Sequence, residues 1–300
     1  FLHEILDEDI SKSFAKPDVG GLEETAQEKL SHYKGEGDIV EEGMQDIDTT
    51  KRVSYSQLNT YEDCPKKYKY SYVLRVPSKP HASLSFGSTI HNTLKDFYTL
   101  LKDSREGFEG IVEKPTEEKL LELYDMHWLS HGYDSKAHEE KRKLSGKSML
   151  KKYYKNLYKE DQKPYRLEES FSVHVGESVF VGKIDRIDIV NEGKEKLEVE
   201  IIDYKTGKVK NDANIKKDLQ LPLYALFAEQ KLGLKVVAAK YVFVEHGEVV
   251  EVDVSEERKE AAKNRVVEII ENIKKKDFTP TPGYLCRYCD YNTVCEDAMV

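Results

Sequence analysis

The sequence has no apolar run of about 18 residues, so it lacks the segment that a transmembrane helix needs. It also lacks a positively charged start followed by an apolar stretch, which argues against a secretory signal. With only four cysteines in 300 residues and no such signal, a disulfide framework is disfavoured. The chain begins with Phe1 in place of Met, which indicates a fragment or a processed product. These absences predict a cytoplasmic protein without membrane association.

The excess of acidic over basic residues is confined to the first 50 residues. The formal net charge is -9, but residues 1–50 alone hold 14 acidic and 4 basic side chains, and residues 51–300 are close to neutral. The acidic segment 1–50 has no sustained apolar period and is predicted to be a largely disordered linker. A folded domain is expected over 51–300, and its partners cannot be judged from the charge of the whole chain.

Hydrophobic periodicity changes along this domain from helical to strand-like. Apolar spacings of three and four predict helices first, and alternation after Pro164 predicts strands, followed by further helices. The sequence therefore predicts an α/β protein. The expected helices cover 87–102, 116–131, 135–160, 212–232 and 255–276, and the expected strands cover 167–175, 179–190, 197–205 and 236–245.

Carboxylates converge on two predicted β-hairpins. A hairpin symmetric about Lys194 places Asp185 opposite Asp203, with β-carbons roughly 5 Å apart. The preceding hairpin places Glu168 opposite Asp185, and Lys205 shares the face of Asp203. Opposed like charges need compensation, which Mg²⁺ or Mn²⁺ would supply while activating water. The alternative is a solvated strand face with ordinary Asp–Lys pairs.

The four cysteines fall into a three-plus-one pattern. Cys286, Cys289 and Cys295 lie close together near the end, and Cys64 lies far upstream. Four thiolates suit a 4Fe-4S cluster or a tetrahedral Zn²⁺, and the absence of two close pairs favours iron–sulfur over a zinc ribbon. Such a group would join the first helix to the tail in a structural role. Four unrelated buried thiols are the alternative.

Basic and aromatic residues alternate on the predicted helix 135–160, where Lys151 and Lys152 neighbour two tyrosines. That combination suits contact with single-stranded nucleic acid. A solvated helix that packs Leu144 and Leu150 inward is favoured slightly over it. Lys66 and Lys67, next to Cys64, form a second candidate surface.

Taken together, these motifs resemble the RecB-type exonuclease branch of the PD-(D/E)XK nuclease superfamily. The similarity is greatest to the branch with an iron–sulfur staple, typified by the AddB nuclease domain and the CRISPR-associated RecB-like exonucleases. It covers about residues 53–298. The matching stretches are 54–68, 87–91, 182–188, 203–207, 220–224 and the last three cysteines.

The resemblance implies a role for each matching residue. His91, Asp185, Asp203 and the carbonyl of Tyr204 would be metal ligands, and Lys205 would be the catalytic lysine. Glu168 would be the supporting acid, with Glu169 as the substitute. Gln220 and Tyr224 share one helix face and would contact DNA or order the site, with Pro222 marking a first turn or a kink. The implied fold is a central mixed sheet flanked by helices, with additional N-terminal helices and the iron–sulfur staple.

We therefore expect a Mg²⁺- or Mn²⁺-dependent deoxyribonuclease that acts from an end of single-stranded DNA in repair or recombination. Residues 1–6 resemble the tail of a UvrD-like helicase core, which would make the chain the nuclease part of a helicase–nuclease. The helicase could instead lie on a partner chain. Two alternatives remain: a non-catalytic DNA-binding module of the same fold, and a zinc-bound interaction domain. Polarity and the choice between DNA and RNA stay open.

Overall fold

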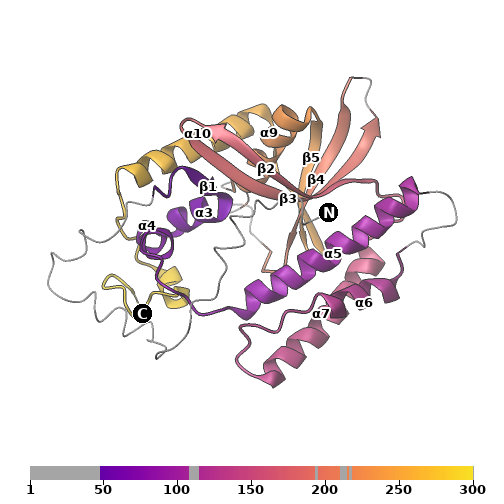
Figure 1. The fold of residues 1–300 in the computed structure, drawn as a ribbon, viewed down its shortest axis with the longest axis horizontal. Coiled ribbons are helices and arrows are strands. Elements are labelled where there is room, and N and C mark those ends of the chain that lie inside the picture. Colours follow the sequence, from indigo (N-terminus) through magenta and orange to yellow (C-terminus); the bar gives the residue numbers. More distant parts are fainter. Residues whose placement is uncertain (1–47, 108–114, 193–194, 210–214, 216–217, 300) are drawn as a thin grey trace, which may run out of the picture. The chain divides into compact units, whose positions relative to one another are not determined.

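The computed structural model describes residues 48–107, 115–192, 195–209, 215 and 218–299 (Figure 1). The predicted linker, apart from its last three residues, and the helicase-like segment 1–6 lie outside the described residues. In the part that is described, no helix is both long enough and apolar enough to cross a membrane.

A mixed sheet forms the centre of the domain. Its strand order is β1-β3-β4-β5-β6, and β2 pairs with β3. β1 pairs with β3, and β4 with β5, in parallel, whereas the other pairs are antiparallel. The strands are β1 (Arg52–Ser54), β2 (Pro164–Val175), β3 (Ser178–Glu192), β4 (Leu197–Lys205), β5 (Lys235–Phe243) and β6 (Glu248–Glu251).

Helices cover the sheet in two groups (Figure 1). The side chains of α5 and α6 form one buried cluster with Tyr204 and Val242 of the sheet. Residues of α3, α9 and α10 form a larger cluster against β2, β3 and β5. The helices are α3 (Tyr55–Asp63), α4 (Pro65–Tyr68), the π-helix η2 (Lys69–Val73), α5 (Ala82–Glu106), α6 (Glu117–Met126), α7 (Lys136–Asn156), α9 (Gln220–Leu232), α10 (Glu256–Lys274) and the 3-10 helix η3 (Tyr284–Tyr288).

The architecture confirms the predicted α/β class with a mixed sheet flanked by helices. Several predicted boundaries were wrong. α6 ends at Met126 and α7 at Asn156, before the predicted ends at 131 and 160, and the described residues Asp218 and Leu219 precede α9, which begins at Gln220. Pro222 falls in the first turn, where its missing N–H costs no helical hydrogen bond. α5 is longer than expected at both ends, since its first turn at Ala82–Ser85 is polar or exposed and carries no apolar period.

Both hairpins keep the expected register over most of their length, but β3 and β4 shift by one residue near their turn, where Asn191 pairs with Glu198. The predicted pairing of Asp185 with Asp203 is not formed, because the β3–β4 ladder begins at Arg186. Arg186 pairs with Ile202 across β3 and β4, and Ile187 pairs with Ile201. In the first hairpin, Leu167 pairs with Arg186 and Phe171 with Gly182. Ile184–Asp188 of β3 and Ile201–Tyr204 of β4 are buried without alternation, so both faces of these strands are covered.

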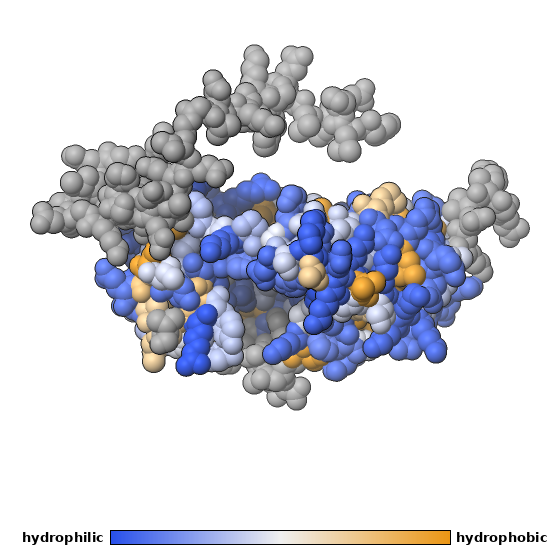
Figure 2. Space-filling model, turned by 90° about the horizontal axis from the view of Figure 1, so that it is seen from below, coloured by the Kyte–Doolittle hydropathy of each residue, from blue (hydrophilic) through white to orange (hydrophobic). Residues whose placement is uncertain are grey.

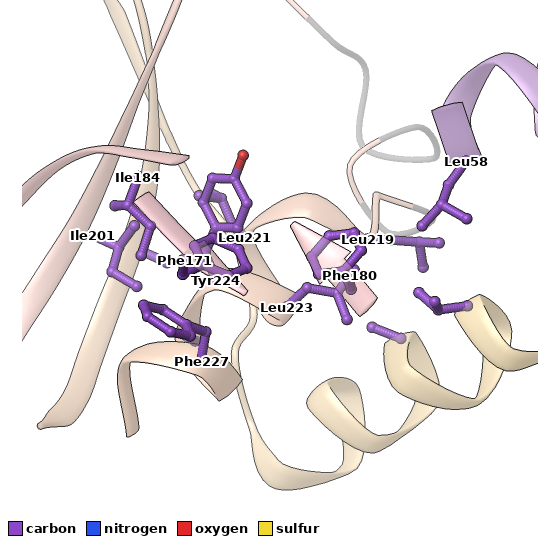
Figure 3. Close-up of a cluster of buried hydrophobic side chains, with 14 of the residues drawn as sticks. Leu58, Phe171, Phe180, Ile184, Ile201, Leu219, Leu221, Leu223, Tyr224 and Phe227 are labelled. Atoms are coloured by element: carbon purple, nitrogen blue, oxygen red, sulfur yellow. The ribbon is translucent and has the colours of Figure 1, made fainter. Parts of the chain in front are cut away.

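Close packing joins α9 to the first hairpin (Figure 3). The ring of Phe171 stacks on Phe227 with centroids 4.1 Å apart and meets Tyr224 edge to face. A β-carbon at Gly182 would lie 2.4 Å from the Phe171 ring, so only glycine leaves room for it. This contact fixes the start of α9 against β3, where the candidate site lies.

The surface is mainly hydrophilic on the face drawn in Figure 2, with small separate hydrophobic areas. Single exposed apolar side chains such as Leu84, Met126 and Leu144 are ordinary on a folded protein. The described residues on that face therefore form no broad apolar surface.

Candidate active site

The site forms where β4 separates from β3. On the side of β3 opposite β2, β1 pairs with residues 179–181 and β4 pairs from Arg186 onward. Beyond Ile202, β4 continues beside β5. The backbone N–H of Tyr204 donates to Oδ2 of Asp185 over 2.8 Å. The divergence of the strands thus creates a gap that the Asp185 carboxylate fills.

Three side chains from three elements meet in this gap. His91 on α5, Glu168 on β2 and Asp185 on β3 each offer one ligand atom, and these atoms all lie within 4.8 Å of one another. Nδ1 of His91 is 3.2 Å from Oδ1 of Asp185. Nitrogen and oxygen donors in this number suit a divalent cation.

An irregular backbone aims Glu168 into the group. Glu168 has φ of +52°, in the left-handed region that a non-glycine residue seldom adopts, and its neighbours Leu167 and Glu169 carry the ladder on either side. Lys183 pairs with its carboxylate. Backbone strain of this kind is typical of functional sites. Of the two acids considered from the sequence, the structure brings Glu168 to the group.

A second polar group adjoins the first and contains Asp203, Lys205 and Gln220. Nζ of Lys205 lies 2.6 Å from Oδ2 of Asp203 and donates to Oε1 of Gln220 over 2.8 Å. Nε2 of Gln220 donates to Oδ1 of Asp203 over 2.7 Å and to the hydroxyl of Tyr224 over 3.0 Å. The amide thus bridges the carboxylate and the ammonium, and its two ends are fixed by opposite charges.

Electrostatics link the two groups. Burial and the charge of Asp185 together raise the pKa of Asp203 to about 6, against the lowering effect of Lys205. Burial would lower the pKa of His91, but the hydrogen bond and charge of Asp185 outweigh it and raise that pKa. The buried carboxylates of Asp185 and Asp203 repel each other, and a bound cation would relieve this repulsion.

The predicted metal ligands are thus divided. His91 and Asp185 share the group with Glu168, whereas Asp203 is held beside it by Lys205 and Gln220. Tyr204 contacts Asp185 through its N–H. The donor set fits a divalent cation, because it offers two carboxylates and one imidazole, and His91 is 30% exposed to solvent.

The four cysteines line one cavity of about 100 Å³ between α4 and η3. All four are free thiols. Among the described residues, no three of the cysteine sulfurs lie within 4.8 Å of one another. Backbone N–H groups of Thr281 and Gly283 donate to the sulfurs of Cys64 and Cys286. Those of Gly283 and Met299 lower the pKa of Cys286.

The candidate DNA-binding lysines lie on α4 and α7. Lys66 pairs with Asp297, and Lys67 lines the cysteine cavity. Lys151 and Lys152 are exposed on α7, with Lys151 3.9 Å from Glu117. α7 buries Leu150 as predicted, but Leu144 is 69% exposed where an inward position was predicted. Tyr153, one of the two tyrosines considered for nucleic-acid contact, is buried.

Sequence reasoning missed two residues around Gln220. Asp218 and Tyr241 are buried and hydrogen-bonded to each other and to the start of α9. The sequence did offer a signal for Asp218, because an Asp just before a helix often accepts a hydrogen bond from one of the free N–H groups of the first turn. Tyr241 had no such signal, because it reads as an ordinary apolar strand residue.

The mixed sheet flanked by helices carries paired acidic groups with a lysine beside them. The family model described as "PD-(D/E)XK nuclease superfamily" matches residues 52–296, and the chain belongs to that superfamily.

Individual relatives are distant. Gene 69 protein of Mycobacterium phage L5 is 23% identical over 81% of this chain and 95% of its own length. An ATP-dependent helicase/deoxyribonuclease component of Clostridium acetobutylicum is 26% identical over 58% of this chain, which spans only 17% of that protein. A solved structure from Eubacterium rectale, described as an exonuclease, covers 89% of this chain and 97% of its own at 13% identity, with a TM-score of 0.45.

Proposed function

We propose that this chain is a divalent-metal-dependent deoxyribonuclease that hydrolyses single-stranded DNA from an end, in cytoplasmic DNA repair or recombination. Membership of the nuclease superfamily supports the reaction type, and the relative named as a helicase/deoxyribonuclease component supports work beside a helicase. The observation that carries the proposal is the contact of Lys205 with both Asp203 and Gln220, next to the His91–Asp185 group.

His91, Asp185 and Asp203 would hold Mg²⁺ or Mn²⁺, with Glu168 and the carbonyl of Tyr204 as further ligands. A metal bound there would lower the pKa of a coordinated water and stabilise charge on the phosphate. The protein's part is to keep these donors in place: Tyr204 fixes Asp185 by its N–H, and Asp185 fixes His91.

Lys205 would act on the reacting atoms. The side chain of Lys205 is 26% exposed. Its ammonium can therefore donate to an attacking water or a phosphate oxygen while Asp203 and Gln220 hold it. A preorganised donor of this kind contributes about a hundred- to a thousandfold in rate. Because Gln220 and Tyr224 are buried, we assign them to ordering Lys205 and Asp203 rather than to DNA contact. Lys66, Lys67, Lys151 and Lys152 would contact the DNA backbone.

The test is cleavage of end-labelled linear single-stranded DNA with Mn²⁺ or EDTA. We expect Mn²⁺-dependent release of label by the wild type and by Lys208→Ala, an exposed lysine three residues away, but not by Lys205→Ala. Circular single strands should resist if an end is required. DNA binding without cleavage by folded wild type would instead support the non-catalytic module.

The cysteine cavity would hold a 4Fe-4S cluster. Tetrahedral zinc at about 2.3 Å from each sulfur would draw the four sulfurs to within about 4 Å of one another. The wider spacing and the cavity between them favour the larger group. Anaerobic purification should give iron with acid-labile sulfide, lost in Cys289→Ser. Stoichiometric zinc without iron would support the zinc-bound interaction domain.

A further inference from the structure

A buried acid outside the predicted motifs lies directly behind Gln220. Asp218 is 5% exposed and precedes α9. Its Oδ1 accepts the backbone N–H of Gln220 over 2.9 Å and the hydroxyl of Tyr241 over 2.6 Å. Its Oδ2 accepts the hydroxyl of Tyr55 over 3.3 Å. One carboxylate thus joins β5, α3 and the first turn of α9.

The loop around Asp218 is tied down as well. Arg258 on α10 donates to the backbone carbonyl of Asp218 over 2.6 Å. Burial, reinforced by the Asp218 charge, raises the pKa of Tyr55 and of Tyr241 above the usual range for a phenol. Both hydroxyls therefore keep their protons and are donors to the carboxylate.

Tyr241 connects Asp218 to Lys205. The Tyr241 hydroxyl also lies 3.4 Å from Oε1 of Gln220, and its ring lies 4.9 Å from Nζ of Lys205. A phenol has one proton to donate. The shorter bond runs to Asp218, so the carboxylate directs the Tyr241 proton away from the Gln220 amide. Without an acceptor at 218, the same proton would turn to Oε1 of Gln220 as a second donor and shift the amide that Lys205 contacts.

We propose that Asp218 is a positioning residue for the nuclease reaction: it anchors the backbone of Gln220 and accepts the hydrogen bond of the Tyr241 hydroxyl, so that the Gln220 amide holds Lys205 on Asp203. The inference rests on the proposed function, because its effect on rate presupposes cleavage. The carboxylate of Asp218 acts on the site through its contacts with Gln220 and Tyr241.

The experiment is a double-mutant cycle on the full chain with Mn²⁺ and single-stranded DNA. Asp218→Ala should lower kcat at least about tenfold and leave KM within about twofold, since the lost contact orders a reacting group rather than binding DNA. Asp218→Asn keeps an acceptor for Gln220 and Tyr241 and should stay within about threefold of wild type. Asp218→Ala should cost nothing further in a Gln220→Ala background.

Asp253 is the matched control. Its Oδ1 accepts the N–H of Ser255 over 2.9 Å directly before α10, the same local contact far from Lys205 along the chain. Asp253→Ala should leave kcat unchanged. If Asp218→Ala does not fold, Asp218→Leu fills a similar volume without an acceptor and replaces it in the cycle. The inference would be overturned if Asp218→Ala, or Asp218→Leu in its place, kept the wild-type kcat. It would also be overturned if the loss in that variant simply added to the loss in Gln220→Ala.

A second readout separates this inference from the proposed function. The side-chain NH₂ signal of Gln220 in ¹⁵N NMR can be assigned by its loss in Gln220→Ala. It should move in Asp218→Ala and stay near its place in Asp218→Asn, even in a protein that cleaves no DNA. An unmoved signal in Asp218→Ala would refute the positioning role, whereas absent wild-type cleavage with a moved signal would refute only the nuclease.

Discussion

Two buried carboxylates lie three residues apart on β3 and have different surroundings. Asp185 is 7% exposed and Asp188 is 3% exposed. Asp185 meets His91 and the N–H of Tyr204 in the gap between strands. Asp188 lies 3.0 Å from Nε of Arg186. Burial alone therefore does not distinguish a site residue from a structural one. The hydrogen-bond and charge partners of each carboxylate make that distinction.

The surroundings of Asp188 are closed. Arg186 is 3% exposed, stacks its guanidinium 3.7 Å from the ring centre of Tyr98 and donates to the hydroxyl of Tyr204 over 2.7 Å. Burial raises the pKa of Asp188 despite the opposing charge of Arg186. This ion pair has no opening toward a substrate, whereas the imidazole beside Asp185 is 30% exposed.

The largest expected effect separates the two acids by activity. Asp185→Asn removes a charged donor from the group with His91 and Glu168. We expect cleavage to fall at least about a hundredfold, in line with loss of a group that stabilises the transition state. Steady-state assays with Mn²⁺ on labelled single-stranded DNA measure it. Asp188→Asn, assayed at a temperature where it is folded, should remain within about tenfold of wild type; equal losses in both would break the comparison.

The next effect separates them by stability. Asp188→Asn leaves the buried Arg186 charge without its counter-ion, and the pKa of Arg186 is held well above its usual value, so it cannot shed that charge. Breaking a buried pair in this way costs about 3 kcal/mol or more. Urea unfolding in EDTA should show this loss for Asp188→Asn and little loss for Asp185→Asn. A neutral result would mean that Arg186 finds compensation from Tyr98 and Tyr204.

The sequence predicted one of these regions well and the other not at all. Hairpin symmetry gave the register that brings Glu168 and Asp185 together, because turn position and alternation determine strand pairing. It did not predict that β4 leaves β3 after Ile202, which is set by the competing partner β5. Arg186 lies on β3, whereas the tyrosines that it contacts, Tyr98 and Tyr204, come from α5 and β4. No periodicity within one segment reports such a contact. The roles of the site residues stay predictions.

A smaller effect of opposite sign is expected at Asp203. Burial raises its pKa to about 6 from 3.8, so the folded metal-free protein holds this proton more tightly than the unfolded chain. Stability should therefore fall as pH rises from about 4 to about 6, and remain lower above that. Asp203→Asn removes this cost and should stabilise the metal-free protein at pH 7.5 by about 3 kcal/mol.

Thermal unfolding of both proteins in EDTA between pH 4 and pH 8 provides the measurement. The advantage of Asp203→Asn should shrink toward pH 4, where the wild-type acid is protonated in both states. Excess Mg²⁺ should reverse the order, because the wild type gains a bound cation that the amide holds less well. An advantage that does not change with pH would point to packing instead.

The smallest effect tests whether the two regions are independent where they touch. Tyr204 belongs to both: its hydroxyl accepts from Arg186, and its backbone N–H donates to Asp185. Tyr204→Phe deletes only the hydroxyl and keeps the N–H, so it should cost about 1 kcal/mol of stability and leave kcat within about twofold. Urea unfolding and Mn²⁺ assays on one preparation measure both. A large fall in kcat with unchanged stability would show that the Arg186 cluster sets the geometry of Asp185, and the closed side of β3 would then be part of the active site.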